Sequence, residues 1–280
     1  MNINNYNDIC RRLGYSYPRR EARAIATMLL EEGFQLGLAD ALSGAIEALS
    51  PCQKDKLEAM VERLSQGEPV QYVLGKAPFC DRWFSVDKRC LIPRPETEEL
   101  CRWVEDDNCK GCILDVGTGS GCIAVTLALD CPGTRVAACD ISHGALSVAA
   151  ANASLLGATV ELLRWDILMP PSSSLQRQWN AIVSNPPYVG EAEKASIGKN
   201  VLCHEPHEAL FVSDDDPLRF VRAIAAYGAA TLTKGGTLYL EINPLHAETA
   251  QEVVAGAGFS STSLRNDQFG KTRFLKGFLS

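Results

Sequence analysis

From residue 112 onward, short apolar runs alternate with segments whose apolar residues recur at helical spacing. The expected strands are 112–116, 135–139, 159–163, 180–184, 236–242, 260–265 and 272–278. The expected helices are 121–129, 142–156, 216–232 and 245–256. Such alternation predicts an α/β fold with a mostly parallel, doubly wound seven-stranded sheet covered on both faces. Only 266–271 separate the last two strands, which predicts an antiparallel hairpin at the end of the chain.

The first part of the chain has a different pattern. Residues 1–75 predict a helical bundle domain, with helices at Arg20–Leu30, Ala39–Leu49 and Cys52–Ser65. Aromatic and polar residues are interleaved over 76–90, which predicts a β-hairpin linker around Asp81 and Arg82. The α/β domain is then expected to span 91–280, with a further helix starting near Glu96.

Charge and hydropathy restrict the possible partners. The 280 residues include 34 acidic and 27 basic side chains, for a net charge of -7, without a run of Lys or Arg. This balance disfavours direct nucleic-acid binding, which depends on neutralising phosphates. The N-terminus lacks the basic and apolar regions of a signal peptide, and no apolar run approaches the ~18 residues of a membrane helix. We therefore expect a cytoplasmic protein with no membrane partner, and nothing suggests more than a monomer.

The eleven cysteines do not indicate a redox or metal site. Most lie in apolar segments, where free cysteine behaves as a small hydrophobic residue. Cys109 and Cys112 form a C-x-x-C pair, but it leads into a strand, whereas a redox pair opens a helix. Cys203, His204 and His207 have no fourth ligand at a familiar spacing, so we expect no metal.

The segment Asp115-Val116-Gly117-Thr118-Gly119-Ser120-Gly121 connects an expected strand to a helix. Glycines permit positive φ and let a ligand approach the backbone, and ligands of open α/β sheets bind at the carboxyl ends of strands. The spacing is G-x-G-x-G, whereas a dinucleotide turn has G-x-G-x-x-G. A tight turn without a ligand is the alternative interpretation.

Acidic residues follow three successive strands, and together they predict an S-adenosylmethionine site. Asp115 would repel a pyrophosphate but favours the cationic methionine end of this cofactor. Asp140 can accept both ribose hydroxyls. Asp166 can accept the adenine amino group, and Ile167 can pack on the ring.

Asn185-Pro186-Pro187-Tyr188 follows the fourth expected strand and is the candidate reactive segment. The prolines cannot extend the ladder and make a rigid turn. The Asn185 side-chain oxygen and the Pro186 carbonyl can accept the two N–H bonds of a planar amino group, which directs its nitrogen toward a methyl donor. Tyr188 can stack on the flat group or exclude water. A simple proline turn is the alternative for this tetrapeptide.

With these motifs the chain resembles the release-factor glutamine methyltransferases of the HemK/PrmC type, which methylate the side-chain amide of the glutamine in the Gly-Gly-Gln motif of peptide-chain release factors. The resemblance covers nearly the whole length. Besides the two motifs above, it rests on three further segments: Gly67-Glu68-Pro69-Val70-Gln71-Tyr72, Leu91 to Leu100, and Glu205-Pro206 with Ala209-Leu210.

The resemblance implies a class I methyltransferase fold that uses S-adenosylmethionine and releases S-adenosylhomocysteine. It implies that the chain transfers methyl groups to N5 of the glutamine in class 1 release factors and so modulates translation termination. Residues 1–75 would help to dock the release factor. The implied cofactor residues are Gly117, Thr118, Gly119, Ser120, Gly121 and Asp140, to which the strand-end pattern adds Asp115, Asp166, Ile167 and Asn185. The implied substrate residues are Asn185, Pro186, Pro187 and Tyr188, of which Asn185, Pro186 and Tyr188 would be catalytic.

Two positions depart from the family, and some roles stay open. Ile167 stands where an aromatic residue is common, with Trp165 just before Asp166, and the stretch Asn243 to His246 has no assigned role. Pro93 and Arg94 could line the substrate entrance, but we expect Arg94 to form a structural ion pair with Glu96 or Glu98. The Glu205-Pro206-His207 loop could gate the pocket or fill it.

Two other functions are alternatives to this one. A nucleic-acid adenine N6-methyltransferase would need a basic groove, and a binding module without activity would have lost Asn185 or a glycine.

Overall fold

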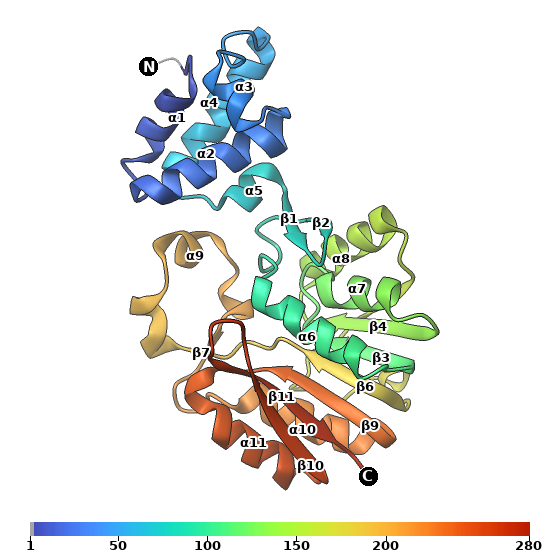
Figure 1. Ribbon diagram of the computed structural model, residues 1–280. Helices are drawn as coiled ribbons and strands as arrows, with labels where there is room; N and C mark the ends of the chain where they lie inside the picture. Colours follow the sequence, from blue (N-terminus) through green and yellow to red (C-terminus); the bar gives the residue numbers. More distant parts are fainter. Residues whose placement is uncertain (1–2) are drawn as a thin grey trace. The chain divides into compact units, whose positions relative to one another are not determined.

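A seven-stranded sheet dominates the computed structural model, which describes residues 3–280. Its strands are β3 (Gly111–Val116), β4 (Thr134–Asp140), β5 (Val160–Arg164), β6 (Trp179–Ser184), β9 (Leu232–Glu241), β10 (Ser261–Asn266) and β11 (Thr272–Phe278). In space their order is β10-β11-β9-β6-β3-β4-β5 (Figure 1). Strands β5, β4, β3, β6 and β9 are parallel, and β11 is antiparallel to both β9 and β10. The predicted mostly parallel sheet with a terminal antiparallel hairpin is confirmed.

Helices cover both faces of this sheet. Side chains alternate along β3: Ile113 joins the apolar cluster formed with α6, α7 and α8, and Leu114 joins the cluster formed with α10 and α11. Both side chains are fully buried. The helices are α6 (Pro95–Asp106), α7 (Cys122–Asp130), α8 (His143–Leu156), α10 (Arg219–Thr231) and α11 (Ala247–Gly256). This is the doubly wound arrangement expected from the alternation of strands and helices.

Local signals define the ends of the two helices nearest the glycine turn. Gly121 has φ 81° and is the N-cap of α7. The Ser142 side chain accepts a hydrogen bond from the Ala145 N–H and caps α8, which ends at Gly157 in the left-handed conformation. Both predicted boundaries of α8 are confirmed to within one residue.

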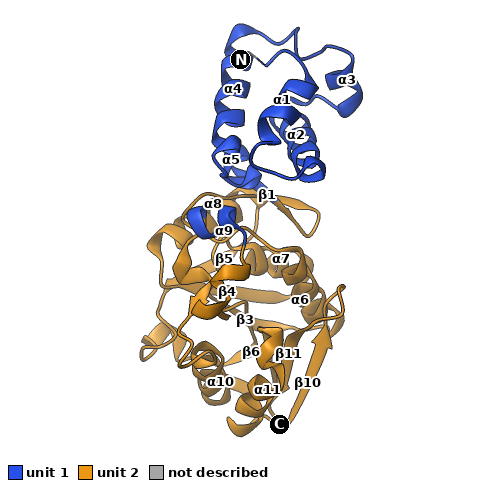
Figure 2. Cartoon of the chain, turned by 90° about the vertical axis from the view of Figure 1, so that its left-hand side faces the viewer, with its two compact units in different colours: residues 1–77, 198–204 blue, residues 78–197, 205–280 orange. Residues whose placement is uncertain are grey.

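The chain divides into two compact units (Figure 2): the first holds the described residues up to Ala77 with Gly198–His204, and the second holds Pro78–Ile197 and Glu205–Ser280. The first unit is helical. Its elements are α1 (Tyr6–Leu13), α2 (Arg19–Phe34), α3 (Leu38–Leu42), α4 (Pro51–Ser65), α5 (Val70–Leu74) and α9 (Lys199–His204). The predicted helix over 39–49 is wrong, because α3 ends at Leu42 and Gly44 follows with φ +96°, a conformation that a helix cannot contain.

The predicted hairpin is present as β1 (Lys76–Phe79) and β2 (Arg82–Ser85). Its two turn residues, Cys80 and Asp81, have φ of 45° and 57°, which matches the twist of a tight two-residue hairpin turn.

The segment between β6 and α10 contains elements that periodicity does not predict. Strands β7 (Val189–Gly190) and β8 (Phe211–Val212) pair in parallel, and short 3-10 turns lie at Glu191–Ser196 and His207–Ala209. Further 3-10 turns are Ser173–Leu175 and Pro244–His246.

Two features of residues 3–280 bear on binding. No helix there is long and apolar enough to cross a membrane. No group of three or more His, Cys, Asp or Glu side chains in that range is arranged to hold a metal ion, and none of the eleven cysteines forms a disulfide bond.

Candidate active site

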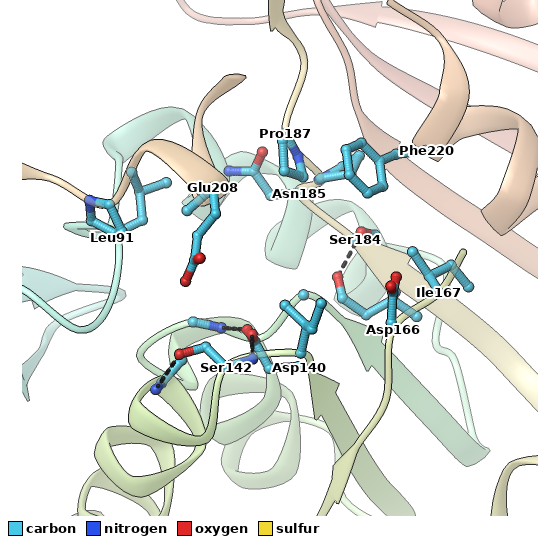
Figure 3. A pocket seen from close by; sticks show the side chains of 18 of the residues that line it. Leu91, Asp140, Ser142, Asp166, Ile167, Ser184, Asn185, Pro187, Glu208 and Phe220 are labelled. Atoms are coloured by element: carbon cyan, nitrogen blue, oxygen red, sulfur yellow. Dashed lines mark hydrogen bonds between the residues drawn. The ribbon is translucent and has the colours of Figure 1, made fainter. Parts of the chain in front are cut away.

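A cavity of about 250 Å³ opens at the carboxyl ends of the central parallel strands, within the α/β unit. The glycine turn, the β4 and β5 ends and the segment after β6 all contribute to its wall. Figure 3 shows Leu91 and Glu208 on one side, Asn185, Pro187 and Phe220 on another, Asp166 and Ile167 on a third, and Asp140 and Ser142 on the fourth. Of the sequence-predicted site residues, eight line the cavity: Gly117, Gly119, Asp140, Asp166, Ile167, Asn185, Pro186 and Pro187. The other five lie behind this wall: Asp115, Thr118, Ser120, Gly121 and Tyr188.

The glycines of the turn have different tasks. Gly117 and Gly119 have φ of +75° and +56°, and a Cβ added to either would meet nothing within 4 Å. They form an open cradle on the cavity side, where a ligand can approach the backbone. A Cβ on Gly121 would meet the Ala149 Cβ at 3.0 Å, so this glycine allows α8 to pack against the turn.

Asp140 ties the end of β4 to the glycine turn. Its Oδ2 accepts a hydrogen bond from the Gly119 N–H at 2.9 Å, and its Oδ1 accepts one from the Ser142 N–H at 2.9 Å. Burial raises the pKa of this carboxyl above its ordinary value. Because a carboxylate has about four lone-pair sites, Asp140 can still accept from a ligand in the cavity.

Asp115 lies inside the turn and not on the cavity wall. Its side chain is fully buried, and Oδ2 accepts the Thr118 hydroxyl at 2.6 Å. Oδ1 has no hydrogen-bond partner in the part of the chain that the structure describes. Burial raises the pKa of Asp115 to about 7. Through Thr118, Asp115 stabilises the turn, and its unpaired oxygen is an unused acceptor close behind the cradle.

This raised pKa predicts a pH dependence of stability. Between about pH 4 and pH 7, the folded chain keeps a proton on Asp115 that the unfolded chain has lost, so stability falls as pH rises, by up to about 1.4 kcal/mol per unit. Asp115→Asn removes this titration and should make the melting temperature fall less between pH 5 and pH 8 than in the wild type. The exposed Asp215→Asn is the control. Parallel curves for wild type and Asp115→Asn would contradict the assignment.

The β5 end supplies an apolar wall. The Asp166 Oδ1 accepts the Leu168 N–H at 2.9 Å, which fixes the loop that carries Ile167 into the cavity. Trp165 is 8% exposed and also lines the cavity, and its indole N–H donates to the Met169 carbonyl at 3.0 Å. An aromatic ring is therefore present one position before Asp166, although Ile167 stands where the family often has one.

The segment after β6 forms part of the cavity wall. The Asn185 Nδ2 donates to the Thr97 Oγ1 at 3.0 Å, while no group of residues 3–280 donates a hydrogen bond to its Oδ1. Pro186 and Pro187 line the cavity and have no N–H.

Tyr188 has a different place from the expected one. Its hydroxyl donates to the Glu241 Oε1 at 2.8 Å and accepts from Arg273 at 3.1 Å, so these two bonds fix the ring, and Tyr188 does not line the cavity.

Asn152 supports the turn from α8, and sequence reasoning missed it. Its side chain is fully buried; Nδ2 donates to the Ser120 carbonyl at 2.8 Å and to the Ser85 carbonyl at 2.9 Å, and Oδ1 accepts the Ser85 N–H at 2.7 Å. It thus joins the glycine turn to β2.

We expect Asn152→Ala to lower the free energy of unfolding of the α/β unit by about 3 kcal/mol, because three backbone groups lose their buried partner. Chemical denaturation measures this, with Ser154→Ala, an exposed side chain of the same helix, as control. A loss below about 0.5 kcal/mol, the range of ordinary surface changes, would mean that water replaces the amide.

Several other residues at the site also escaped prediction. The Ser184 hydroxyl donates to the Val116 carbonyl at 2.6 Å and ties the end of β6 to the end of β3. Phe220 and Ile224 line the cavity one helical turn apart on α10, a helix that was predicted over 216–232 without a part in the site.

Arg94 pairs with Glu205 at 2.7 Å, and not with Glu96 or Glu98 as expected. Glu205 is 4% exposed and also accepts the Ile92 N–H at 3.1 Å, so it fastens the 205–209 loop beside the cavity.

Comparisons with known proteins agree with this geometry. Family models match at residues 97–211, for the methyltransferase small domain, and at residues 8–75, for the PrmC N-terminal domain. A release factor glutamine methyltransferase of Bacteroides thetaiotaomicron is 40% identical over 92% of this chain and 93% of its own length. One of Flavobacterium psychrophilum is 38% identical over 99% of each. A solved T. thermophilus 16S rRNA methyltransferase in complex with AdoMet and guanosine is 15% identical, covers 73% of this chain and 50% of its own, and superposes with a TM-score of 0.52, which supports the fold alone.

Proposed function

This chain belongs to the release factor glutamine methyltransferase family, and we propose that it transfers a methyl group from S-adenosylmethionine to N5 of the glutamine in the Gly-Gly-Gln motif of class 1 release factors, with S-adenosylhomocysteine as product. This modification modulates translation termination, and we place the enzyme in the cytoplasm as a monomer. The observation that carries the proposal is that Asn185, whose Oδ1 accepts no hydrogen bond from residues 3–280, and Pro186 lie together on the wall of a cavity that also holds the glycine cradle.

The residues present fit S-adenosylmethionine. The open cradle at Gly117 and Gly119 accommodates its methionine end, and the cationic charge of that end favours the ionised form of Asp115 behind the cradle. Asp140 accepts the ribose hydroxyls, while Asp166 accepts the adenine amino group between Ile167 and the apolar wall. Thr118, Ser120 and Gly121 hold the turn in shape. When bound, the cofactor supplies an electrophilic methyl group on a sulfonium.

Asn185 and Pro186 prepare the substrate nitrogen. An amide nitrogen is a poor nucleophile because its lone pair is delocalised into the carbonyl. The Asn185 Oδ1 and the Pro186 carbonyl each accept one N–H bond, which leaves the nitrogen lone pair directed across the cavity. Pro187 closes that side of the pocket. No strong base is required before transfer, because the nitrogen becomes acidic once it is methylated, and catalysis is mainly positioning.

The helical unit has its own part in the proposal. We assign residues 1–75, which include the matched PrmC N-terminal domain at 8–75, to docking of the release factor. We assign the chemistry to the catalytic domain expected over 91–280, and the linking role to the hairpin segment 76–90. Adenine in nucleic acid has a similar planar amino group, but the net charge of -7 offers no matching basic surface.

The test is a methyl-transfer assay with labelled S-adenosylmethionine and a purified class 1 release factor. A second release factor, with the glutamine of its Gly-Gly-Gln motif replaced by alanine, is the control. Label in the first and not in the second supports both the substrate and the target residue. Equal labelling of both places the target elsewhere, and no labelling by a protein that still binds S-adenosylmethionine overturns the glutamine assignment.

A further inference from the structure

Behind the cavity wall, a connected set of hydrogen bonds leads away from Asn185. The Asn185 Nδ2 donates to the Thr97 Oγ1 at 3.0 Å, and the Thr97 hydroxyl donates to the Glu241 Oε2 at 2.7 Å. The other oxygen of Glu241, Oε1, accepts the Tyr188 hydroxyl at 2.8 Å, and Tyr188 in turn accepts from Arg273 at 3.1 Å. Thr97 and Glu241 are 2% and 1% exposed, so water does not compete for these bonds. Neither residue touches the proposed substrate pocket.

Proton counting gives this set a direction. A threonine hydroxyl has one proton, and at Thr97 the partner that can only accept is the Glu241 carboxylate. Because that proton goes to Glu241, the Thr97 oxygen can only accept from Asn185. The group of Asn185 that can donate is the amide nitrogen. The Asn185 oxygen must then point the other way. If the amide turned over, two acceptors would meet at Thr97 and the Asn185 NH₂ would face the cavity.

Glu241 is itself held in place from two sides. Burial raises the pKa of its carboxyl, while the bonds from Thr97 and Tyr188 and the charge of Arg273 act in the opposite direction. Arg273 is anchored by an ion pair to Asp267 at 2.9 Å, whose side chain is fully buried. The acceptor at the end of the set therefore stays fixed when the substrate enters or leaves.

We propose that Thr97 and Glu241 are positioning residues that hold the Asn185 side-chain amide with its oxygen toward the substrate. The inference rests on the proposed function, in which Asn185 accepts an N–H bond of the target amide. If the Asn185 amide were turned over, its NH₂ group would face the NH₂ group of the substrate amide. Both groups are hydrogen-bond donors, so no bond could form between them. The acceptor orientation is thus a property of residues from α6 and the end of β9, far from Asn185 in the chain.

The test compares Thr97→Val, Thr97→Ser and Glu241→Gln in the full-length enzyme. Valine keeps the shape of threonine but has no hydroxyl, whereas serine keeps the hydroxyl. We expect Thr97→Val to lower kcat for methyl transfer by about 100-fold, the usual cost of a misplaced group, with the Kd for S-adenosylmethionine within about 3-fold of wild type. Thr97→Ser should recover kcat to within about 5-fold of wild type, since its hydroxyl bridges the same partners. Glu241→Gln, which can offer a donor to Thr97, should lose kcat as Thr97→Val does.

A second measurement does not depend on the substrate. Hydrogen exchange of the Asn185 side-chain NH₂, followed by ¹⁵N NMR, should be slow in the wild type and in Thr97→Ser and faster in Thr97→Val. Wild-type kcat in a folded Thr97→Val enzyme, or equal exchange in all three, would overturn the proposal. The proposal would also be overturned if the serine and valine variants lost kcat and melting temperature equally, because that pattern indicates that Thr97 only stabilises the fold. If the wild type does not methylate a release factor while the exchange pattern holds, the proposed function fails and the orientation of Asn185 stands.

Discussion

An enzyme with Asn185→Ala is expected to bind S-adenosylmethionine within about 5-fold of wild type and to methylate its substrate at least about 1000-fold more slowly, because the lost contact orients the reacting nitrogen. The variant removes the acceptor Oδ1, and with it one of the two groups that direct the amide lone pair. The cofactor keeps its cradle at Gly117 and Gly119, which does not involve Asn185. Single-turnover transfer of labelled methyl measures the chemical step separately from binding.

The matched control for this variant is Asn266→Ala, an exposed asparagine at the end of β10 that bonds only within its own hairpin. It should transfer methyl groups at the wild-type rate. If Asn185→Ala raised KM and left kcat unchanged, Asn185 would serve ground-state binding alone, and the positioning mechanism would be wrong.

The parts of the fold that were predicted correctly depend on local signals. Ser142 and Gly157 bound α8 because a side-chain cap and a left-handed terminus act within a few residues of the helix. The helix predicted over 39–49 is wrong beyond Leu42, also for a local reason. Ser43 ends α3, and Gly44 follows it with positive φ. The apolar residues continue at helical spacing past this break, so their pattern concealed it. Strands β7 and β8 have two residues each, too few to show any alternation, and they pair only through contacts distant in sequence.

The sequence predicts which residues lie at the strand ends that form the site, but it does not predict the hydrogen bonds between their side chains. The chain places Asp140, Asp166 and Asn185 after successive parallel strands, and parallel strands bring their carboxyl ends to one edge. Which way a side chain points there depends on partners elsewhere in the chain. Tyr188 bonds to Glu241, 53 residues away, and Asn185 to Thr97, 88 residues away. No periodicity within a segment carries that information, so the positions of Tyr188 and Asp115 behind the wall required the structure.

Asp140→Ala is expected to weaken S-adenosylmethionine binding by about 100- to 10,000-fold. In the proposed site, this carboxylate accepts hydrogen bonds from two ribose hydroxyls. Each hydrogen bond to a charged group contributes about 1.5 to 3 kcal/mol, and about 1.4 kcal/mol corresponds to a tenfold change in Kd. The same change also releases the Gly119 N–H, which Asp140 holds at 2.9 Å, so the cradle loses its shape as well as an acceptor. Isothermal titration with S-adenosylmethionine gives the Kd directly.

Two further variants separate these contributions. Asp140→Asn retains one oxygen acceptor but loses the charge and gives up at least one N–H acceptor, so its Kd should lie between those of the wild type and Asp140→Ala. The exposed Asp215→Ala controls for the loss of one negative charge and should bind as the wild type does. If Asp140→Ala bound S-adenosylmethionine with wild-type affinity, the ribose would have to lie elsewhere. The cradle would then seat a different ligand. Among residues 3–280, no other carboxylate on the cavity wall is hydrogen-bonded to the glycine turn, so none could replace Asp140 beside the cradle.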